Sequence, residues 1–256
     1  MLSSKLSKVG VVILAAGKGT RLNCVDRPKV MLEIGGKPII SYILNTLKEA
    51  GFSKERVVVV DGFCREKLED YVGDAVVYAH QEEQKGTAHA AYVGSRALSD
   101  ALETVVVING DDSAFYTKET IINFIESHQA AQAVLSVLSA ELDDPSLYGR
   151  IIKHETGKVE IIEKEYLTEE QKKVREISTG TFCLDKHWFE GIFPHMPPLR
   201  KLGEYGLPTA VAIAAEAGKK IHVEKLQNNE EWFGINTPPE LAEADRRKNN
   251  THILLS

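Results

Sequence analysis

The sequence predicts an α/β fold with a mostly parallel sheet, and three observations support this prediction. Short apolar runs alternate with segments of helical spacing through about the first 140 residues, as expected when strands and helices alternate along a chain. The first run, Val9–Leu14, carries no polar side chain, which is typical of a parallel strand covered on both faces. A glycine-rich stretch follows directly, and open parallel sheets bind ligands at the carboxyl ends of their strands.

The other elements of the first half are expected from the same patterns. Apolar residues at positions 39, 40, 43, 44 and 47 have helical spacing, so residues 38–50 should form a helix that Gly51 would end. The other expected helices cover residues 65–71, 87–98 and 118–129. The other expected strands cover residues 56–60, 75–79, 104–108 and 133–139.

After about residue 140 the pattern changes. Two short apolar segments, 151–154 and 158–163, flank Glu155-Thr156-Gly157, which predicts a hairpin. A polar helix is expected over 168–174 and a strand over 176–184, followed by a helix, a strand and a helix over 207–217, 220–226 and 239–248. No Pro/Gly/Ser-rich linker divides the chain, so we expect one domain over residues 1–256, with the second half added to the same sheet.

Composition excludes several classes of protein. Hydrophobic residues make up 43% and charged residues 27% of the 256 positions, which are globular values and not those of collagen, low-complexity disorder or a disulfide-rich mini-protein. A chain of this length buries about three quarters of its unfolded surface without needing disulfides or metals to fold. The net charge of -6 argues against a nucleic-acid partner, because such proteins usually carry a basic footprint.

The cysteines and the N-terminal segment bear on location. Three widely spaced cysteines, Cys24, Cys64 and Cys183, form no C-x-x-C pair, which favours a reducing, cytoplasmic setting. The apolar run at 9–16 is far shorter than the ~20 residues of a membrane span. Lysines precede it as in a secretion signal, but basic residues follow at once and no A-x-A site does. We therefore expect a cytoplasmic protein with no membrane partner.

The glycine-rich stretch after the first strand reads L-A-A-G-K-G-T-R-L over residues 14–22. Gly17 and Gly19 would let the backbone approach a ligand and present N–H groups to an anion. Lys18, Arg21 and Lys29 place three cations beside this loop. The combination indicates a cradle for a triphosphate, since a simple glycine turn would leave the cations unexplained.

Two better-known phosphate motifs fit less well. The dinucleotide fingerprint needs a small residue where Leu22 stands, and an acidic residue ~20 positions further on. Asp61, at the end of the second predicted strand, comes about twice as late. The Walker A pattern is absent. A dinucleotide-dependent oxidoreductase remains an alternative at this point, as does a turn without function.

A second polar motif, Q-E-E-Q-K-G-T-A-H-A, covers residues 81–90. A glutamine amide offers one acceptor and two donors, so Gln81 could pair with one edge of a base. Gly86 permits close backbone approach, and Thr87 could cap the next helix. A polar loop with a helix cap explains the same residues, and His89 is interpreted as a structural helix residue.

A third motif, Asn109-Gly110-Asp111-Asp112, follows the strand at 104–108. A carboxylate at a strand's carboxyl end beside a triphosphate is a natural Mg²⁺ ligand, because Mg²⁺ takes few protein oxygens and keeps waters and phosphates. An Asx turn after a strand is the plainer interpretation, and Asp112 is expected to be a turn residue.

Together these motifs resemble the signature of the sugar-1-phosphate nucleotidyltransferases. The sequence L-A-A-G-K-G-T-R-L is followed by P-K at 28–29 and by E-I-G-G-K-P-I-I at 33–40. The resemblance covers essentially the whole chain and is strongest to the pyrophosphorylase domain of bacterial N-acetylglucosamine-1-phosphate uridyltransferases. It implies a Rossmann-like sheet flanked by helices, of the nucleotide-diphospho-sugar transferase type, with a small sugar-binding lobe. Residues from about 1 to 140 would bind the nucleotide and those from about 141 to 256 the sugar.

The resemblance also implies roles for individual residues. Arg21 and Lys29 would contact the triphosphate and act in catalysis, and Asp111 and Asn236 would hold Mg²⁺ as the cofactor. The implied nucleotide-binding residues are Leu14, Ala15, Ala16, Gly17, Gly19, Thr20, Gln81, Gly86 and Thr87. The implied sugar-binding residues are Asn109, Gly149, Glu163 and Ser178.

The departures from the family pattern concern the presumed sugar pocket. Ser178 stands where the N-acetylglucosamine enzymes normally have Asn, and Asn109 stands where Tyr is common. Thr237 follows Asn236 where a second Asn is usual, and the loop from 21 to 28 looks one residue longer. A missing hydrogen-bond partner can shift substrate preference by orders of magnitude, so the sugar stays open.

The expected reaction is transfer of a uridylyl group from UTP to a hexose 1-phosphate, with N-acetylglucosamine 1-phosphate favoured, giving a UDP-sugar and pyrophosphate. Glucose 1-phosphate, dTTP or CTP are alternative substrates, and an inactive nucleotide-sugar-binding regulatory protein is an alternative function. No hexapeptide repeats of a left-handed β-helix are present, so we expect no acetyltransferase activity. The sequence leaves the oligomeric state open.

Overall fold

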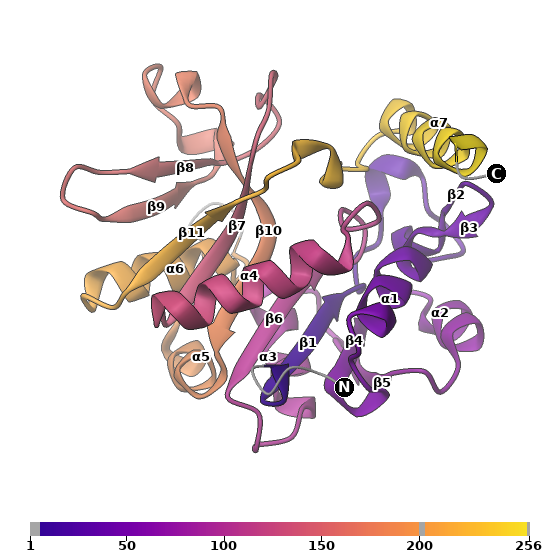
Figure 1. The fold of residues 1–256 in the computed structure, drawn as a ribbon, viewed down its shortest axis with the longest axis horizontal. Helices are drawn as coiled ribbons and strands as arrows, with labels where there is room; N and C mark the ends of the chain where they lie inside the picture. The colour runs from indigo at the N-terminus through magenta and orange to yellow at the C-terminus, as the bar shows by residue number, and fades with distance from the viewer. Residues whose placement is uncertain (1–5, 200–202, 255–256) are drawn as a thin grey trace.

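The computed structural model describes residues 6–199 and 203–254 and has a seven-stranded sheet at its centre (Figure 1). The strand order is β11-β7-β10-β6-β1-β4-β5. The strand β1 (Val9–Leu14) lies between β4 (Val57–Asp61) and β6 (Thr104–Asn109) and is parallel to both. The strand β5 (Val77–His80) continues the parallel arrangement to the sheet edge. The carboxyl ends of these four strands therefore share one edge.

The second half of the chain extends the same sheet. The strand β10 (Glu176–Asp185) runs antiparallel between β6 and β7 (Leu135–Glu141). The edge strand β11 (Ile221–Lys225) is parallel to β7. A mixed, mostly parallel sheet results, as the sequence predicted. The predicted hairpin is also present, with β8 (Arg150–Lys153) paired to β9 (Val159–Ile162) in a small separate sheet.

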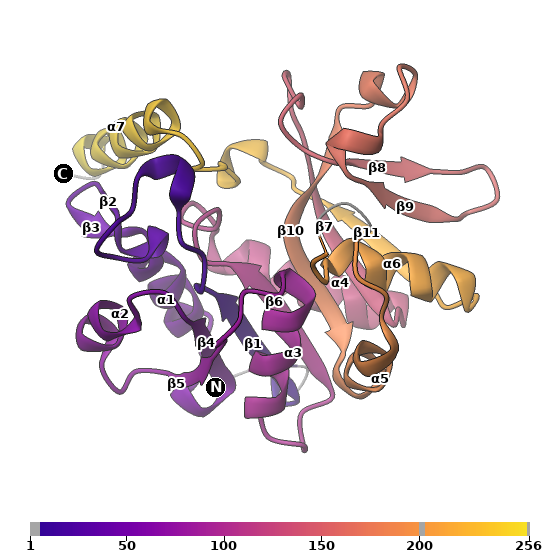
Figure 2. The same cartoon turned by 180° about the vertical axis from the view of Figure 1, so that it is seen from behind.

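Helices cover both faces of the sheet (Figures 1 and 2). One face packs against helices that contribute Ile43, Leu68 and Phe124 to its core, and the helices are α1 (Ile39–Glu49), α2 (Arg65–Val72) and α4 (Lys118–Ala131). The opposite face packs against α3 (Thr87–Ala97), α5 (Lys186–Ile192) and α6 (Leu207–Glu216). The long α7 (Pro238–Leu254) lies beside the β2–β3 ribbon (Glu33–Ile34, Lys37–Pro38).

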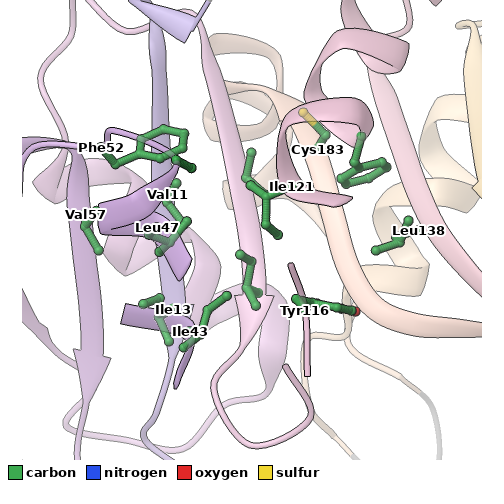
Figure 3. Close-up of a cluster of buried hydrophobic side chains, with 14 of the residues drawn as sticks. Val11, Ile13, Ile43, Leu47, Phe52, Val57, Tyr116, Ile121, Leu138 and Cys183 are labelled. Atoms are coloured by element: carbon green, nitrogen blue, oxygen red, sulfur yellow. The ribbon is translucent and has the colours of Figure 1, made fainter. Parts of the chain in front are cut away.

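The core follows from the residue patterns that predicted the elements. Alternate residues of a strand point to opposite faces, so Val11 and Ile13 enter one core whereas Val12 enters the other. Figure 3 shows Val11 and Ile13 against Ile43 and Leu47 of α1. The helical spacing of the apolar residues in α1 places these side chains on one face.

The largest differences from the prediction lie in the second half of the chain. The expected helix over 168–174 is wrong, because only a single 3-10 turn at Gln171–Lys173 forms there. That segment has no apolar stripe to bury, and tertiary packing of such a stripe is what stabilises most helices. The helix α5 (Lys186–Ile192) was not predicted, and α7 continues to Leu254 instead of ending at 248. Within the described ranges, every helix is too short or too polar to cross a lipid bilayer.

The close approach of α3 to the sheet depends on Gly94, and this gives a stability prediction. A Cβ atom at Gly94 would lie 2.4 Å from Val12 Cγ1 and 2.7 Å from Val60 Cγ2. Because overpacking a core costs about 1–3 kcal/mol, Gly94→Ala should lower the free energy of unfolding in urea by that amount. Gly191→Ala is the matched control, since a Cβ at this helical glycine meets nothing within 4 Å and should stabilise. Equal stability of Gly94→Ala and the wild type would contradict the packing described.

Candidate functional site

The loop after β1 turns back on itself at Gly19. Gly19 has a φ of 62°, and a Cβ atom there would lie 2.8 Å from Cys24 Sγ and 3.0 Å from Lys29 Cβ. A left-handed φ combined with so close a neighbour suits glycine alone. A 3-10 turn at Thr20–Leu22 follows. The loop therefore returns to the segment that carries Lys29.

Lys29 is the centre of a polar cluster drawn from three distant segments. Its buried ammonium pairs with Asp111, which follows Gly110 just after the end of β6. The same ammonium donates to Asn236 Oδ1 at 3.1 Å. Arg21 Nη2 donates to the same Asn236 oxygen at 3.0 Å. The structure thus brings together the two predicted catalytic cations and the two predicted metal ligands.

Two neighbouring carboxylates share this one buried cation. Burial, together with the negative charge of Asp111, raises the pKa of Asp112 to about 7. Burial alone would lower the pKa of Lys29, but the charges of Asp111 and Asp112 outweigh burial and raise it. Asp112 lies in a turn as predicted, and its Oδ1 also accepts from Ile235 N at 3.4 Å. The carboxylate oxygens of Asp111 and the amide oxygen of Asn236 fit a Mg²⁺ ion.

A cavity of about 510 Å³ opens in front of this cluster. Its wall contains most of the predicted nucleotide-binding residues, both predicted metal ligands, one predicted catalytic cation and two predicted sugar-binding residues, namely Leu14, Ala15, Ala16, Gly17, Gln81, Gly86, Thr87, Asp111, Asn236, Lys29, Asn109 and Glu163. Arg21, Gly19 and Thr20 do not line it. Gly19 and Thr20 instead shape the turn behind the cavity, and Arg21 reaches the cluster through Asn236.

The orientation of Gln81 is fixed by two acceptors. The buried amide donates through Nε2 to Gly86 O at 3.3 Å, and the same atom lies 2.8 Å from His89 Nδ1. Burial, with the nearby charge of Lys85, lowers the pKa of His89, so the imidazole is neutral at pH 7 and Nδ1 can accept. This arrangement leaves Gln81 Oε1 to accept a hydrogen bond. His89 was expected to be only a structural helix residue, and its contact with Gln81 is one that residue spacing alone does not reveal.

Gly86 is required where the second motif (residues 81–90) meets the segment just before α6. Its φ is 97°, and a Cβ atom would lie 2.6 Å from Tyr205 O. Sequence reasoning did not assign Gln84, whose Nε2 donates to Ala16 O. Gln84 lines the cavity and ties the second motif to the glycine-rich loop. A second glutamine three residues after Gln81 in the same polar motif is the signal that could have identified it.

A second cavity of about 250 Å³ adjoins the first and shares Thr87, Asn109 and Glu163 with it. Gly149 and Ser178, the other predicted sugar-binding residues, line this second cavity. Burial and the neighbouring Glu165 raise the pKa of Glu163. All four predicted sugar-binding residues thus lie around one connected space.

Aromatic residues that the sequence did not assign complete the second cavity. Tyr148 and Trp232 line it with their rings edge to face, 5.0 Å between centroids. Trp232 Nε1 donates to Thr179 O at 3.1 Å. This hydrogen bond joins β10, at the point where its pairing with β7 is irregular, to the chain before α7. Asn109 hydrogen-bonds Asp112, and it packs so closely that a Cβ atom at Gly180 would lie 2.2 Å from Asn109 Nδ2.

The comparison with known protein families decides the family. Residues 10–249 match the family described as nucleotidyl transferase. The chain belongs to this family. A Heliobacterium modesticaldum protein named bifunctional protein GlmU is 36% identical over 94% of this chain and 52% of its own length. The protein of that name from Caldanaerobacter subterraneus subsp. tengcongensis is 37% identical, over 94% and 53%. The chain therefore spans about half the length of these curated relatives.

A comparison with solved structures bears on the fold. A Bacillus anthracis protein, provisionally assigned as a glucose-1-phosphate thymidylyltransferase and solved in complex with a sucrose, superposes with a TM-score of 0.76. The match covers 94% of this chain and 95% of that one at 21% sequence identity. It confirms a Rossmann-like sheet of the nucleotide-diphospho-sugar transferase type.

The raised pKa of Asp112 predicts a pH-dependent effect of Asp112→Asn. Between about pH 4 and the folded-state pKa of about 7, the folded protein binds one more proton than the unfolded chain, so stability falls as pH rises through this window. Asparagine does not titrate. In EDTA, the melting temperature of Asp112→Asn relative to wild type should therefore rise from pH 5 to pH 8. A difference that stays constant with pH would show that Asp112 is not perturbed.

Proposed function

We propose that this nucleotidyl transferase transfers a uridylyl group from UTP to a hexose 1-phosphate, with Mg²⁺ as cofactor and N-acetylglucosamine 1-phosphate as the favoured acceptor. The proposal rests on one observation. Arg21, Lys29, Asp111 and Asn236 contact one another beside a cavity that the glycine-rich loop lines. A triphosphate is bound by cations, by oxygens that hold a metal ion, and by backbone N–H groups that approach its phosphates closely. The proposed products are a UDP-sugar and pyrophosphate.

The reaction needs positioning and charge neutralisation more than covalent chemistry. An oxygen of the sugar phosphate would attack the α-phosphorus of UTP, and pyrophosphate would leave with the electron pair of the broken P–O bond. Asp111 and Asn236 would hold Mg²⁺, which neutralises phosphate charge when bound. Lys29 and Arg21 would then hold the phosphate oxygens. The pairing of Lys29 with Asp111 before any substrate binds supports a preorganised position for this cation beside the phosphates.

The fixed amide of Gln81 supports uracil as the base. With Nε2 directed at Gly86 O and His89 Nδ1, Gln81 presents its acceptor oxygen. The N3–H group of uracil or thymine can donate to that oxygen, whereas cytosine has an acceptor at N3. CTP is therefore disfavoured, and dTTP stays the nearer alternative nucleotide.

The second cavity supports a hexose with an apolar substituent. Polar groups of Glu163, Ser178 and Asn109 face the same space as the rings of Tyr148 and Trp232. Hydroxyl groups of a sugar can bond to the polar side chains, and an acetamido methyl group can pack on the aromatic wall. Glucose 1-phosphate is the alternative acceptor, because it would use the polar groups without the apolar contact.

A regulatory protein that binds nucleotide sugars without turnover is the second candidate. The intact cluster of Lys29, Asp111 and Asn236 favours the enzyme, since a chain that only binds has no need of the metal ligands. A cytoplasmic location, inferred from the cysteines, belongs to the same proposal.

The proposal is tested by measuring pyrophosphate release in the presence of Mg²⁺. UTP, dTTP, CTP and GTP are each combined with glucose 1-phosphate and with N-acetylglucosamine 1-phosphate. We expect release with UTP and N-acetylglucosamine 1-phosphate, and no release when EDTA replaces Mg²⁺. Thermal protection by UTP without release from any pair would support the regulatory protein instead.

Replacing Lys29 should nearly abolish turnover. Removing one preorganised charge from such a site typically costs about 10²–10³ in rate, so Lys29→Ala should lower kcat by that factor in the pyrophosphate assay. Lys67→Ala is the control, because its exposed ammonium pairs with Asp26 at the surface and should leave kcat unchanged. A kcat for Lys29→Ala within about threefold of wild type would show that Lys29 has another role.

The contact between Gln81 and His89 predicts a loss of base discrimination. His89→Ala removes the acceptor that orients Gln81, so the ratio of kcat/KM for UTP over CTP should fall about fivefold to tenfold, the equivalent of one hydrogen bond. Burial lowers the pKa of His89, so in the wild type the ratio should also fall once the pH is brought below the usual titration range of histidine, because a protonated Nδ1 cannot accept. His154→Ala is the control, since its Nε2 pairs with Glu160 in the β8–β9 hairpin. An unchanged UTP/CTP ratio in His89→Ala would refute this role.

A further inference from the structure

A buried carboxylate lies at the end of β4, outside the nucleotide and sugar cavities. Asp61 is the last residue of β4 and is 0% exposed. The register of the parallel strands places His80, the last residue of β5, directly beside it. Glu69 approaches both from α2, the helix next to this edge of the sheet (Figure 1). Three side chains with metal-binding atoms thus come from three different elements.

The contacts within this group leave two oxygens without partners. His80 Nδ1 lies 2.6 Å from Asp61 Oδ1 and 3.9 Å from Glu69 Oε1. One ligand atom from each residue lies within 4.8 Å of the others. Asp61 Oδ2 and Glu69 Oε1 are buried and have no hydrogen-bond partner among the described residues. Buried carboxylate oxygens are normally satisfied, because leaving them bare is costly.

Nearby positive charge compensates these carboxylates only in part. Arg65 Nε lies 4.0 Å from Glu69 Oε1, which is beyond hydrogen-bond distance, and its side chain is largely exposed. A protonated His80 could balance one negative charge but reaches only one oxygen of Asp61. An ion at the centre of the group would satisfy both orphaned oxygens and balance both carboxylates.

We propose that Asp61, Glu69 and His80 bind one divalent transition-metal ion, for which Zn²⁺ is the probe. Imidazole nitrogen and carboxylate oxygen both ligate zinc, and three such protein ligands with one water complete a tetrahedral site. Imidazole favours Zn²⁺ over Mg²⁺ or Ca²⁺, which prefer oxygen ligands. On binding, the ion takes the place of any proton on His80 Nδ1, which is released to solvent, and the side chain of Asp61 turns from that nitrogen to the ion.

The ion has a route from solvent. The side chain of His80 is 46% exposed and borders a cavity of about 330 Å³ that also touches Lys18, Gly62 and Gln81. Because Gln81 follows His80 directly, a bound ion would fix the end of β5 just before the proposed base-reading segment. The metal site goes beyond the proposed function and does not depend on it.

The site is tested by titrating the metal-free, nucleotide-free protein with Zn²⁺ against a chelating dye. We expect one Zn²⁺ per chain, a rise in melting temperature, and a visible absorption band when Co²⁺ is used instead. His80→Ala and Asp61→Asn should each weaken binding at least tenfold and remove the Co²⁺ band. His154→Ala, which changes an exposed His–Glu pair, and Asp111→Asn, which changes the proposed Mg²⁺ site, should both retain it.

Two results would overturn the proposal. The first is less than one Zn²⁺ bound per wild-type chain, which would mean that a proton or a water molecule satisfies the carboxylates. The second is unchanged stoichiometry and affinity in His80→Ala, which would mean that Zn²⁺ binds elsewhere on the surface. Should Asp61→Asn fail to fold, His80→Ala decides alone, because its half-exposed side chain can be removed without opening the core. Pyrophosphate release by a chain that binds no Zn²⁺ would leave the proposed function standing and the metal site refuted.

Discussion

Lys29 is a buried cation that joins three parts of the chain. Its ammonium contacts Asp111 at the carboxyl end of β6 and Asn236 just before α7, and its own segment follows the loop from β1. A buried charge is tolerated only when it is paired, and removing one partner of such a pair is strongly destabilising. The arrangement therefore holds the glycine-rich loop, the proposed metal ligands and the last helix in one geometry before any substrate binds.

The order of the strands explains why this geometry is available. Because β1 and β6 are adjacent and parallel, the glycine-rich loop and the segment from 109 to 112 leave the same edge of the sheet side by side. The edge strand β5 delivers Gln81 to the same edge. The antiparallel β10 pairs Ser178 with Ser139 of β7, and residues of its irregular stretch at 178–182 line the second cavity. The proposed nucleotide side and the proposed sugar side of the site are thus consequences of one topology.

Much of this could be predicted from local patterns, and the remainder depends on long-range contacts. Apolar runs such as Val9–Leu14 and the motifs at 14–22 and 81–90 have periodicities or residue types that identify them in isolation. The helix expected at 168–174 failed because polar composition does not show whether a segment has a surface to pack on. The pairing of Gln81 with His89 and the aromatic wall formed by Tyr148 and Trp232 arise only when separate turns and strands are brought together.

We propose that Lys29, Asp111 and Asn236 form one site for a metal-bound triphosphate. Calorimetric titration of UTP with and without Mg²⁺, on the wild type and on Asp111→Asn, tests it most directly. We expect Mg²⁺ to tighten UTP binding to the wild type by at least tenfold and to change the UTP affinity of Asp111→Asn very little. Equal UTP affinity in the wild type with and without Mg²⁺, or the same Mg²⁺ effect in both proteins, would contradict it.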